Sequence, residues 1–159
     1  MERRLFLKSA ALGTMAMGIA RSAFSAETYY PVKVDRDLFK AINRAKDLEH
    51  LSGLEKSHVP MIKAPDKVKA GEPFTVEVSI GEKIHPMGPR HWIEHLSLSL
   101  GNEPAGRASF QSRGYLQPKA TFTVVLTKES APAGKASLVV RQRCNLHGYW
   151  ENSRNVTVI

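Results

Sequence analysis

The spacing of hydrophobic residues predicts one helix near the start of the chain and a series of strands after it. Between residues 35 and 51, apolar side chains recur every three or four positions, with Asp35 as a candidate N-cap and Gly53 as a natural stop. After residue 70, apolar and polar residues alternate, which is typical of half-buried strands. The alternating segments are residues 74–80, 92–100, 107–111, 120–127, 136–143 and 155–159.

Turn-forming residues separate these segments and favour an all-β fold. They cluster at residues 70–72, 101–104 and 131–134. Several short strands at this spacing predict an immunoglobulin-like antiparallel β-sandwich with a short helical N-terminal extension. Within one predicted strand, the period of two places five residues on one face. They are Trp92, Glu94, Leu96, Leu98 and Leu100.

The first 26 residues have the pattern of an export signal. Basic residues precede an uncharged, moderately apolar stretch at 9–20, and small residues follow at 22–26. The pair Arg3-Arg4, followed by Leu-Phe-Leu-Lys, resembles a twin-arginine signal, which predicts a periplasmic protein exported in the folded state. The apolar stretch is too short and too weakly hydrophobic for a stable membrane span. An uncleaved anchor and a retained amphipathic helix are the alternatives.

The remaining chain is expected to hold one domain. A length of 159 residues suffices for a single core, and no interior boundary is visible. We therefore expect an N-terminal extension with a helix over residues 27–54 and a β-sandwich domain over residues 55–159. The formal charge is +8, of which residues 1–26 carry +3, so the remaining chain is mildly basic and suits acidic partners or small anions. Because the basic residues are dispersed and form no known nucleic-acid-binding motif, nucleic acid is not an expected partner.

One cysteine and several histidines carry the candidate chemistry. Cys144 is the only cysteine of the chain, and His147 follows it three residues later. In an oxidising compartment, a lone cysteine forms no internal disulfide, so it is either a buried thiol or a metal-bound thiolate. A thiolate with imidazoles from His58, His85 and His91 suits a redox-active transition metal. A structural zinc site would ordinarily use a second cysteine pair.

Four sequence blocks, taken together and in order, resemble the superoxide reductase family. The resemblance is to the one-iron neelaredoxin type and to the iron domain of desulfoferrodoxin, and it covers about residues 45–159. The blocks are residues 55–60 (EKSHVP), 64–74 (APDKVKAGEPF), 85–91 (HPMGPRH) and 144–151 (CNLHGYWE).

The resemblance implies one mononuclear non-haem iron on an immunoglobulin-like sandwich. Its equatorial ligands would be four histidines, its axial ligand would be Cys144, and the sixth position would be open. The implied activity is the one-electron reduction of superoxide to hydrogen peroxide, with dismutation as a side activity. The implied equatorial ligands are His58, His85, His91 and His147.

Other residues near these blocks are expected to support the site or to lie outside it. The backbone N–H groups of Leu146 and His147 are candidates for hydrogen bonds to the sulfur. Asn145 and Trp150 are expected to shape the loop. His95 is left out of the ligand set as a packing or solvated residue, and His50 is expected at the surface.

The chain departs from the family pattern just before the first histidine. The family places glutamate and lysine directly before it, the lysine to attract superoxide and the glutamate to occupy the sixth site. Here Ser57 stands between Lys56 and His58. A one-residue offset in an extended segment turns a side chain to the other face, so Glu55 and Lys56 are either catalytic or solvated loop charges. Arg90 could supply positive potential instead.

The electron donor is expected to be a separate protein, such as a periplasmic cytochrome. No rubredoxin-type cysteine pair precedes the iron-binding segment. A homo-oligomer is compatible with the sequence. The alternative function is a cupredoxin-like electron-transfer module, but no methionine follows His147, which counts against copper. A sandwich of the sulfur-oxidation carrier type would leave the histidines without a role.

Overall fold

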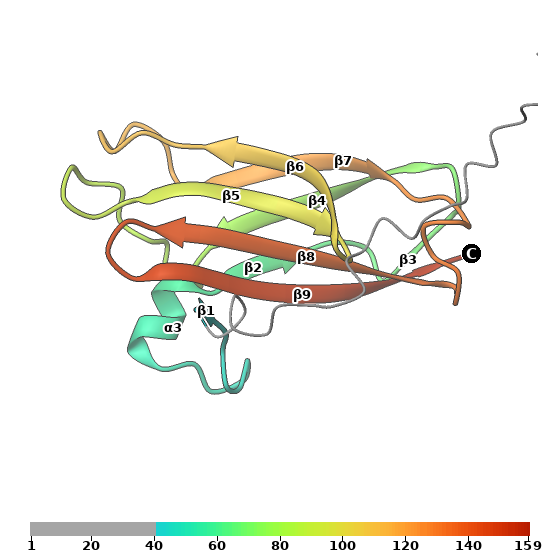
Figure 1. The fold of residues 1–159 in the computed structure, drawn as a ribbon, viewed down its shortest axis with the longest axis horizontal. Helices are drawn as coiled ribbons and strands as arrows, with labels where there is room; N and C mark the ends of the chain where they lie inside the picture. The colour runs from blue at the N-terminus through green and yellow to red at the C-terminus, as the bar shows by residue number, and fades with distance from the viewer. Residues whose placement is uncertain (1–40) are drawn as a thin grey trace, which may run out of the picture. The chain divides into compact units, whose positions relative to one another are not determined.

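In the computed structural model, residues 41–159 are described and form a two-layered β-sandwich (Figure 1). The larger sheet has the order β1-β9-β8-β5-β6, and β3 pairs with β9 beside it. The smaller sheet has the order β2-β4-β7. Pairing is antiparallel except for the two short parallel pairs that β1 and β3 make with β9. The predicted all-β sandwich class is therefore confirmed.

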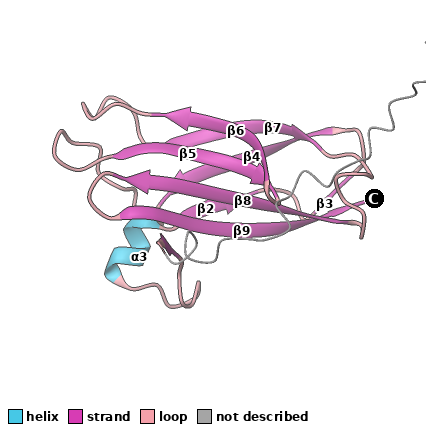
Figure 2. Cartoon of the chain, in the orientation of Figure 1, coloured by secondary structure: helices cyan, strands magenta, loops and turns pink. Residues whose placement is uncertain are grey.

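Loops join the consecutive elements, and those between β4 and β5, β6 and β7, and β7 and β8 are long (Figure 2). A single described helix, α3 (Gly53–His58), precedes the main strands of the described part of the chain. The strands are β1 (Ile42–Asn43), β2 (Pro60–Lys63), β3 (Lys67–Val68), β4 (Pro73–Ile80), β5 (Ile93–Leu100), β6 (Glu103–Ser109), β7 (Lys119–Val125), β8 (Lys135–Cys144) and β9 (Gly148–Val158).

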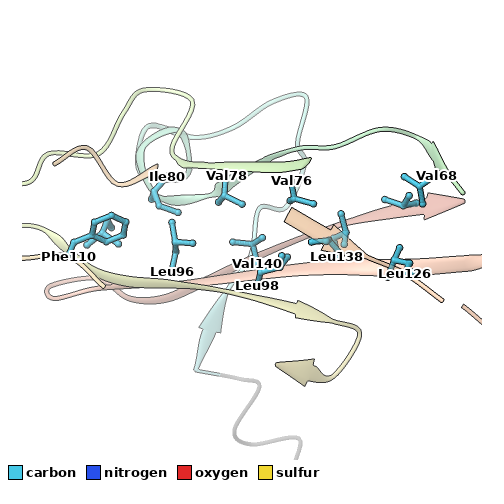
Figure 3. Close-up of a cluster of buried hydrophobic side chains, with 14 of the residues drawn as sticks. Val68, Val76, Val78, Ile80, Leu96, Leu98, Phe110, Leu126, Leu138 and Val140 are labelled. Atoms are coloured by element: carbon cyan, nitrogen blue, oxygen red, sulfur yellow. The ribbon is translucent and has the colours of Figure 1, made fainter. Parts of the chain in front are cut away.

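The core lies between the two sheets and consists mainly of aliphatic side chains, with Phe110 at one end (Figure 3). In β4, Val76, Val78 and Ile80 are buried at every second position, as the period of a strand requires. In β8 the buried row continues past Leu138 and Val140 to Gln142 and Cys144. The alternation that builds the core therefore also carries the cysteine, fully buried, to one end of the sandwich.

The predicted helix over residues 35–51 is wrong where the structure describes it. Residues 41–52 form β1 and a series of bends, and residues 35–40 lie outside the described part. β1 instead pairs in parallel with the start of β9, and the Asn43 side chain donates hydrogen bonds to the carbonyls of His147 and Tyr149. These tertiary contacts outweigh the helical stripe, which is a weak local preference.

The helix α3 begins further along the sequence than predicted, because the residues that cap it lie there. Ser52 is the N-cap of α3, and Glu55 completes a capping box with it. Gly53, expected to end a helix, is instead its first residue.

The predicted face of strand 92–100 is also partly wrong. The pairing of β5 with β8 shifts register between Ile93 and His95, which is a β-bulge. Ile93, Leu96 and Leu98 are fully buried as a result, whereas Glu94 pairs with Arg143 outside the core. The extra residue at the bulge interrupts the alternation of buried and exposed positions. Hydrophobic periodicity alone does not predict the position of a bulge.

The predicted export signal at residues 1–26 lies outside the described residues. Within residues 41–159, no helix has the length and apolar character needed to cross a membrane.

Candidate metal centre

The five side chains singled out by the sequence meet at one end of the sandwich. His58 is the last residue of α3, and His85 and His91 lie in the β4–β5 connection. Cys144 ends β8, and His147 lies in the turn to β9. Figure 1 shows α3, the β4–β5 connection and the β8–β9 turn at the same end of the molecule.

The four imidazole rings form a closed cycle. Neighbouring rings in the order His58, His85, His91, His147 have centroids 4.6, 4.4, 4.9 and 4.6 Å apart, with interplanar angles of 83°, 75°, 74° and 86°. His58 and His91 are farther apart, at 5.8 Å, and their planes differ by 30°. The rings therefore stand around a common centre, with His58 opposite His91.

Ring nitrogens and the sulfur point toward this centre. His58 Nε2 lies 2.9 Å from His147 Nδ1 and 3.2 Å from His85 Nε2. Cys144 Sγ lies 3.1 Å from His91 Nε2 and 3.5 Å from His147 Nδ1. The donor atoms of His58, His91, Cys144 and His147 all lie within 4.8 Å of one another.

These separations fit ligands at right angles around one metal ion. Two imidazole nitrogens each about 2.1 Å from a metal, at right angles, are about 3.0 Å apart. A thiolate at about 2.3 Å and an imidazole nitrogen at about 2.1 Å are about 3.1 Å apart in the same arrangement. The donor set of one thiolate and four imidazoles is also one that iron accepts.

Hydrogen bonds at the far nitrogens fix the tautomers of the two buried histidines. His85 Nδ1 lies 2.6 Å from the Pro86 carbonyl, and His58 Nδ1 lies 2.8 Å from the Leu54 carbonyl. Because a carbonyl only accepts, each Nδ1 carries the proton and each Nε2 presents a lone pair to the centre. Ser57 Oγ lies 2.9 Å from the same nitrogen of His58, so the inserted serine supports the first histidine.

Burial keeps these imidazoles neutral. His58 and His85 are 1% and 2% exposed. Burial lowers the pKa of His58 and of His91, and it lowers the pKa of His85 to about 4. At neutral pH the rings of His58, His85 and His91 are therefore uncharged, and a metal would not have to displace a proton from the nitrogen that faces the centre.

Acidification from pH 6.5 to about 4 is expected to destabilise the metal-free protein. Unfolded histidine takes up a proton near pH 6.5, whereas folded His85 stays neutral down to about pH 4. The unfolded state therefore binds more protons in this window, and the free energy of unfolding falls as pH falls, by up to about 3 kcal/mol from His85. Urea unfolding of the metal-free protein at several pH values measures the slope. His85→Gln should flatten it and the exposed-site variant His50→Gln should not; equal slopes in both variants would contradict the assignment.

Asn145 joins the two loops that carry His91 and the pair Cys144 and His147. Its side chain accepts from the Trp92 N–H at 3.0 Å and donates to the Arg90 carbonyl at 3.0 Å. Its own N–H donates to the Trp92 carbonyl at 3.2 Å. Three hydrogen bonds thus fix the distance between the loops.

Trp150 supports the same region from β9. Its Nε1–H donates to the His147 carbonyl at 3.2 Å. Its ring lies 5.2 Å from that of His58, and the ring planes differ by 31°. Both loop-shaping residues expected from the sequence are therefore placed against the centre.

Asn145→Ala is expected to weaken iron binding by roughly tenfold, because outer-shell partners typically contribute 10–100-fold to metal affinity. Loss of two side-chain hydrogen bonds frees the His91 segment from the Cys144 turn. Competition with a chelator measures the iron affinity. Asn155→Ala, at an exposed asparagine of β9, is the matched control. An affinity for Asn145→Ala equal to that of the control would show that the clamp does not hold the centre.

A close backbone approach positions α3 against the β4–β5 connection. The Gly81 N–H donates to the Val59 carbonyl and the Lys83 N–H to the Lys56 carbonyl, both at 3.0 Å. Gly81 has a φ of +84°, and a Cβ there would lie 2.8 Å from the Ser57 carbonyl oxygen. This glycine therefore lets the histidine that ends α3 approach the loop that carries His85.

Gln142 links the same helix end to β8. Its Nε2 donates to the His58 carbonyl at 3.0 Å in the fully buried interior. Sequence reasoning missed both Gly81 and Gln142. The available signals were a glycine directly after a strand and one polar residue within the buried row of β8.

The structure places the remaining candidate residues as follows. The Glu55 carboxylate accepts hydrogen bonds from the N–H groups of Ser52 and Lys46, at 2.7 and 3.1 Å, and the bonds from Ser52 lower its pKa. Lys56 and Arg90 are exposed. His95 lies on the outer face of the larger sheet near Tyr149, with 6.2 Å between ring centroids.

This fold and this cluster define a β-sandwich protein with a mononuclear site of four imidazoles and one thiolate. The chain belongs to the desulfoferrodoxin family, whose sequence model matches residues 50–153.

Similar proteins and solved structures carry names from the same family. The superoxide reductase of Pyrococcus abyssi is 35% identical over 104 residues, which cover 60% of this chain and 83% of the relative. A relative from Methanocaldococcus jannaschii is 34% identical over 115 residues, which cover 72% of this chain and 92% of the relative. The structure of the superoxide reductase (neelaredoxin) of Ignicoccus hospitalis aligns with a TM-score of 0.63 and 33% identity, covering 80% of this chain and all of that one.

Proposed function

We propose that this chain is a superoxide reductase, which reduces superoxide to hydrogen peroxide at one iron held by its histidine and cysteine cluster. The observation that carries the proposal is the closed cycle of four imidazoles with a thiol sulfur 3.1 Å from one of them. The proposed ligands are His58, His85, His91, His147 and Cys144. A cupredoxin-like copper site uses two histidines, one cysteine and a weak axial ligand, so it would leave two rings of this cycle without a role.

The reaction needs one electron and two protons for each superoxide. An iron held by these residues would supply the electron, and solvent would supply the protons. The residues leave one side of the centre open to a small anion, because His58 and His85 are buried whereas His91 and His147 are not. Histidine binds a metal as a neutral imidazole and cysteine binds it as a thiolate, so these five residues would add one negative charge to a ferrous ion. The remaining positive charge would attract an anion.

Lys56 and Arg90 are proposed to add positive potential around the centre. Both side chains are exposed on segments that carry proposed ligands. The Glu55 carboxylate is held by the N–H groups of Ser52, the N-cap of α3, and of Lys46, so a role at the iron would require it to leave both.

Metal analysis and rapid mixing test this function together. The purified protein should contain one iron per chain and show a thiolate-to-ferric absorption band when oxidised. The reduced protein should be oxidised by superoxide in a fast bimolecular step, with formation of one hydrogen peroxide per iron. Bound copper, or bound iron that superoxide does not oxidise, would contradict the proposal.

We also propose that the protein works in the periplasm and receives electrons from a separate protein such as a cytochrome. The support is the twin-arginine-like pattern of residues 1–26 and the lack of a second cysteine in the chain. Replacing both Arg3 and Arg4 with lysine should leave the protein in the cytoplasm. An unchanged distribution between cell fractions would count against this route.

A further inference from the structure

Large exposed apolar side chains gather at the metal end of the sandwich. Among residues 41–159, eight such side chains are exposed, and six belong to segments at this end. These six are Leu48, Leu54, Tyr115, Leu116, Leu146 and Tyr149. Scattered single apolar residues are ordinary on a protein surface, but a concentration around one site indicates an interaction surface.

The segments that carry these residues contact the ligand segments. Leu146 lies between Cys144 and His147 in the β8–β9 turn. The β6–β7 loop, with Tyr115 86% and Leu116 62% exposed, packs beside the β4–β5 connection, where a Cβ on Gly114 would lie 3.1 Å from the Met87 carbonyl oxygen. The exposed apolar groups thus surround the loops that hold the metal centre.

The same end carries a surplus of positive charge. The exposed basic residues of α3, the β4–β5 connection and the β6–β7 loop are Lys56, Lys83, Arg90 and Arg113. These three segments carry two acidic residues, and one of them, Glu55, is engaged in the capping box of α3. The segment of Leu48 does not change the balance, since its exposed Asp47 and Glu49 are matched by Arg44 and Lys46. Charges of one sign around an apolar contact steer a partner of the opposite sign.

The proposed reaction requires a partner at this end. Each superoxide removes one electron from the centre, and the chain has no second cysteine with which to hold a further thiolate-bound metal. A one-electron donor must therefore approach from outside and return the ferric centre to the ferrous state. His58, His85 and Cys144 are buried, whereas His91 and His147 are not, so a donor reaches the centre from the side of these two histidines.

We propose that the metal end, with Tyr115 and Leu116 as its main apolar contacts, is the docking face for an electron-donor protein. The donor is inferred to present an apolar patch around its own redox group, ringed by acidic residues. This inference rests on the proposed function, since it names the partner that the reductase requires.

The double variant Tyr115→Ser/Leu116→Ser tests the docking face. Its matched control is Val125→Ser/Ile159→Ser, which removes apolar side chains that are 50% and 65% exposed at the opposite end. Each ferric protein is mixed with a reduced acidic c-type cytochrome, and separately with hexaammineruthenium(II), a small donor that needs no docking face. Each ferrous protein is also mixed with superoxide.

The double variant should be reduced by the cytochrome about tenfold more slowly, a typical loss when a main interface contact is truncated. Its reduction by hexaammineruthenium(II) and its oxidation by superoxide should not change. Cytochrome reduction should also slow as salt is raised. Equal cytochrome rates in the double variant and the control would overturn the proposal, and so would a wild-type dimer that the double variant alone dissociates. Failure of wild-type protein to react with superoxide would instead overturn the proposed function.

Discussion

Cys144→Ser is expected to abolish the thiolate-to-ferric absorption band and to slow oxidation by superoxide by at least about 100-fold. Loss of an outer-shell partner alone commonly costs 10–100-fold, and the sulfur is a proposed ligand. Its Sγ lies 3.1 Å from His91 Nε2 and is fully buried, so a serine hydroxyl in its place presents a weaker donor to the same centre. The ferric absorption spectrum and rapid mixing of the reduced variant with superoxide measure the two effects.

Ala136→Ser is the matched control for this variant. Ala136 is buried on the same row of β8 at the opposite end of the strand, so the variant adds a buried hydroxyl without touching the cluster. It should keep both the band and the superoxide rate. If Cys144→Ser kept both as well, the sulfur would not be a ligand.

Among glycine-to-alanine changes within residues 41–159, Gly81→Ala is expected to reduce stability most, and it should also disturb the iron site. A left-handed backbone costs an alanine about 1–2 kcal/mol. The added Cβ would also collide with the Lys83 carbonyl oxygen and lie 2.8 and 2.9 Å from those of Ser57 and Lys56. Lys56 and Ser57 directly precede His58, so movement of these carbonyl groups to relieve the crowding is expected to displace that ligand. A further loss of roughly 1–3 kcal/mol is expected from overpacking.

Gly71→Ala is the matched control, because it introduces the left-handed backbone strain without the steric contacts that a Cβ makes at Gly81. Gly71 has nearly the same φ, +81°, but nothing lies within 4 Å of its Cβ position. Urea unfolding should show the smaller loss for Gly71→Ala, with an unchanged ferric spectrum. Equal stabilities and equal spectra for the two variants would show that the close approach at Gly81 does not position the histidines.

The predictions that the structure confirmed were those that depend on short-range patterns. Alternation of apolar and polar residues predicted β4, β7 and β8 to within a few residues of their observed bounds. It could do so because alternate burial is a local property of a strand in a sandwich. The helix predicted over residues 35–51 is absent from residues 41–51, where β1 pairs with β9 and the hydrophobic stripe is outweighed by these long-range contacts. The prediction of which β5 residues share one face was wrong at the β-bulge, because the bulge depends on the register with β8.

The sequence by itself determined the chemistry of the site. One cysteine and four well-placed histidines, in an order typical of one family, indicated a thiolate and imidazole metal centre, because ligand type belongs to the side chain itself. Only the tertiary structure decided the cyclic order of the rings, the nitrogen that each presents, and the clamp that Asn145 forms. It also placed Glu55 in a capping box rather than at the metal. These features depend on contacts such as that between His58 and His147, which are 89 residues apart and meet only when the two sheets pack.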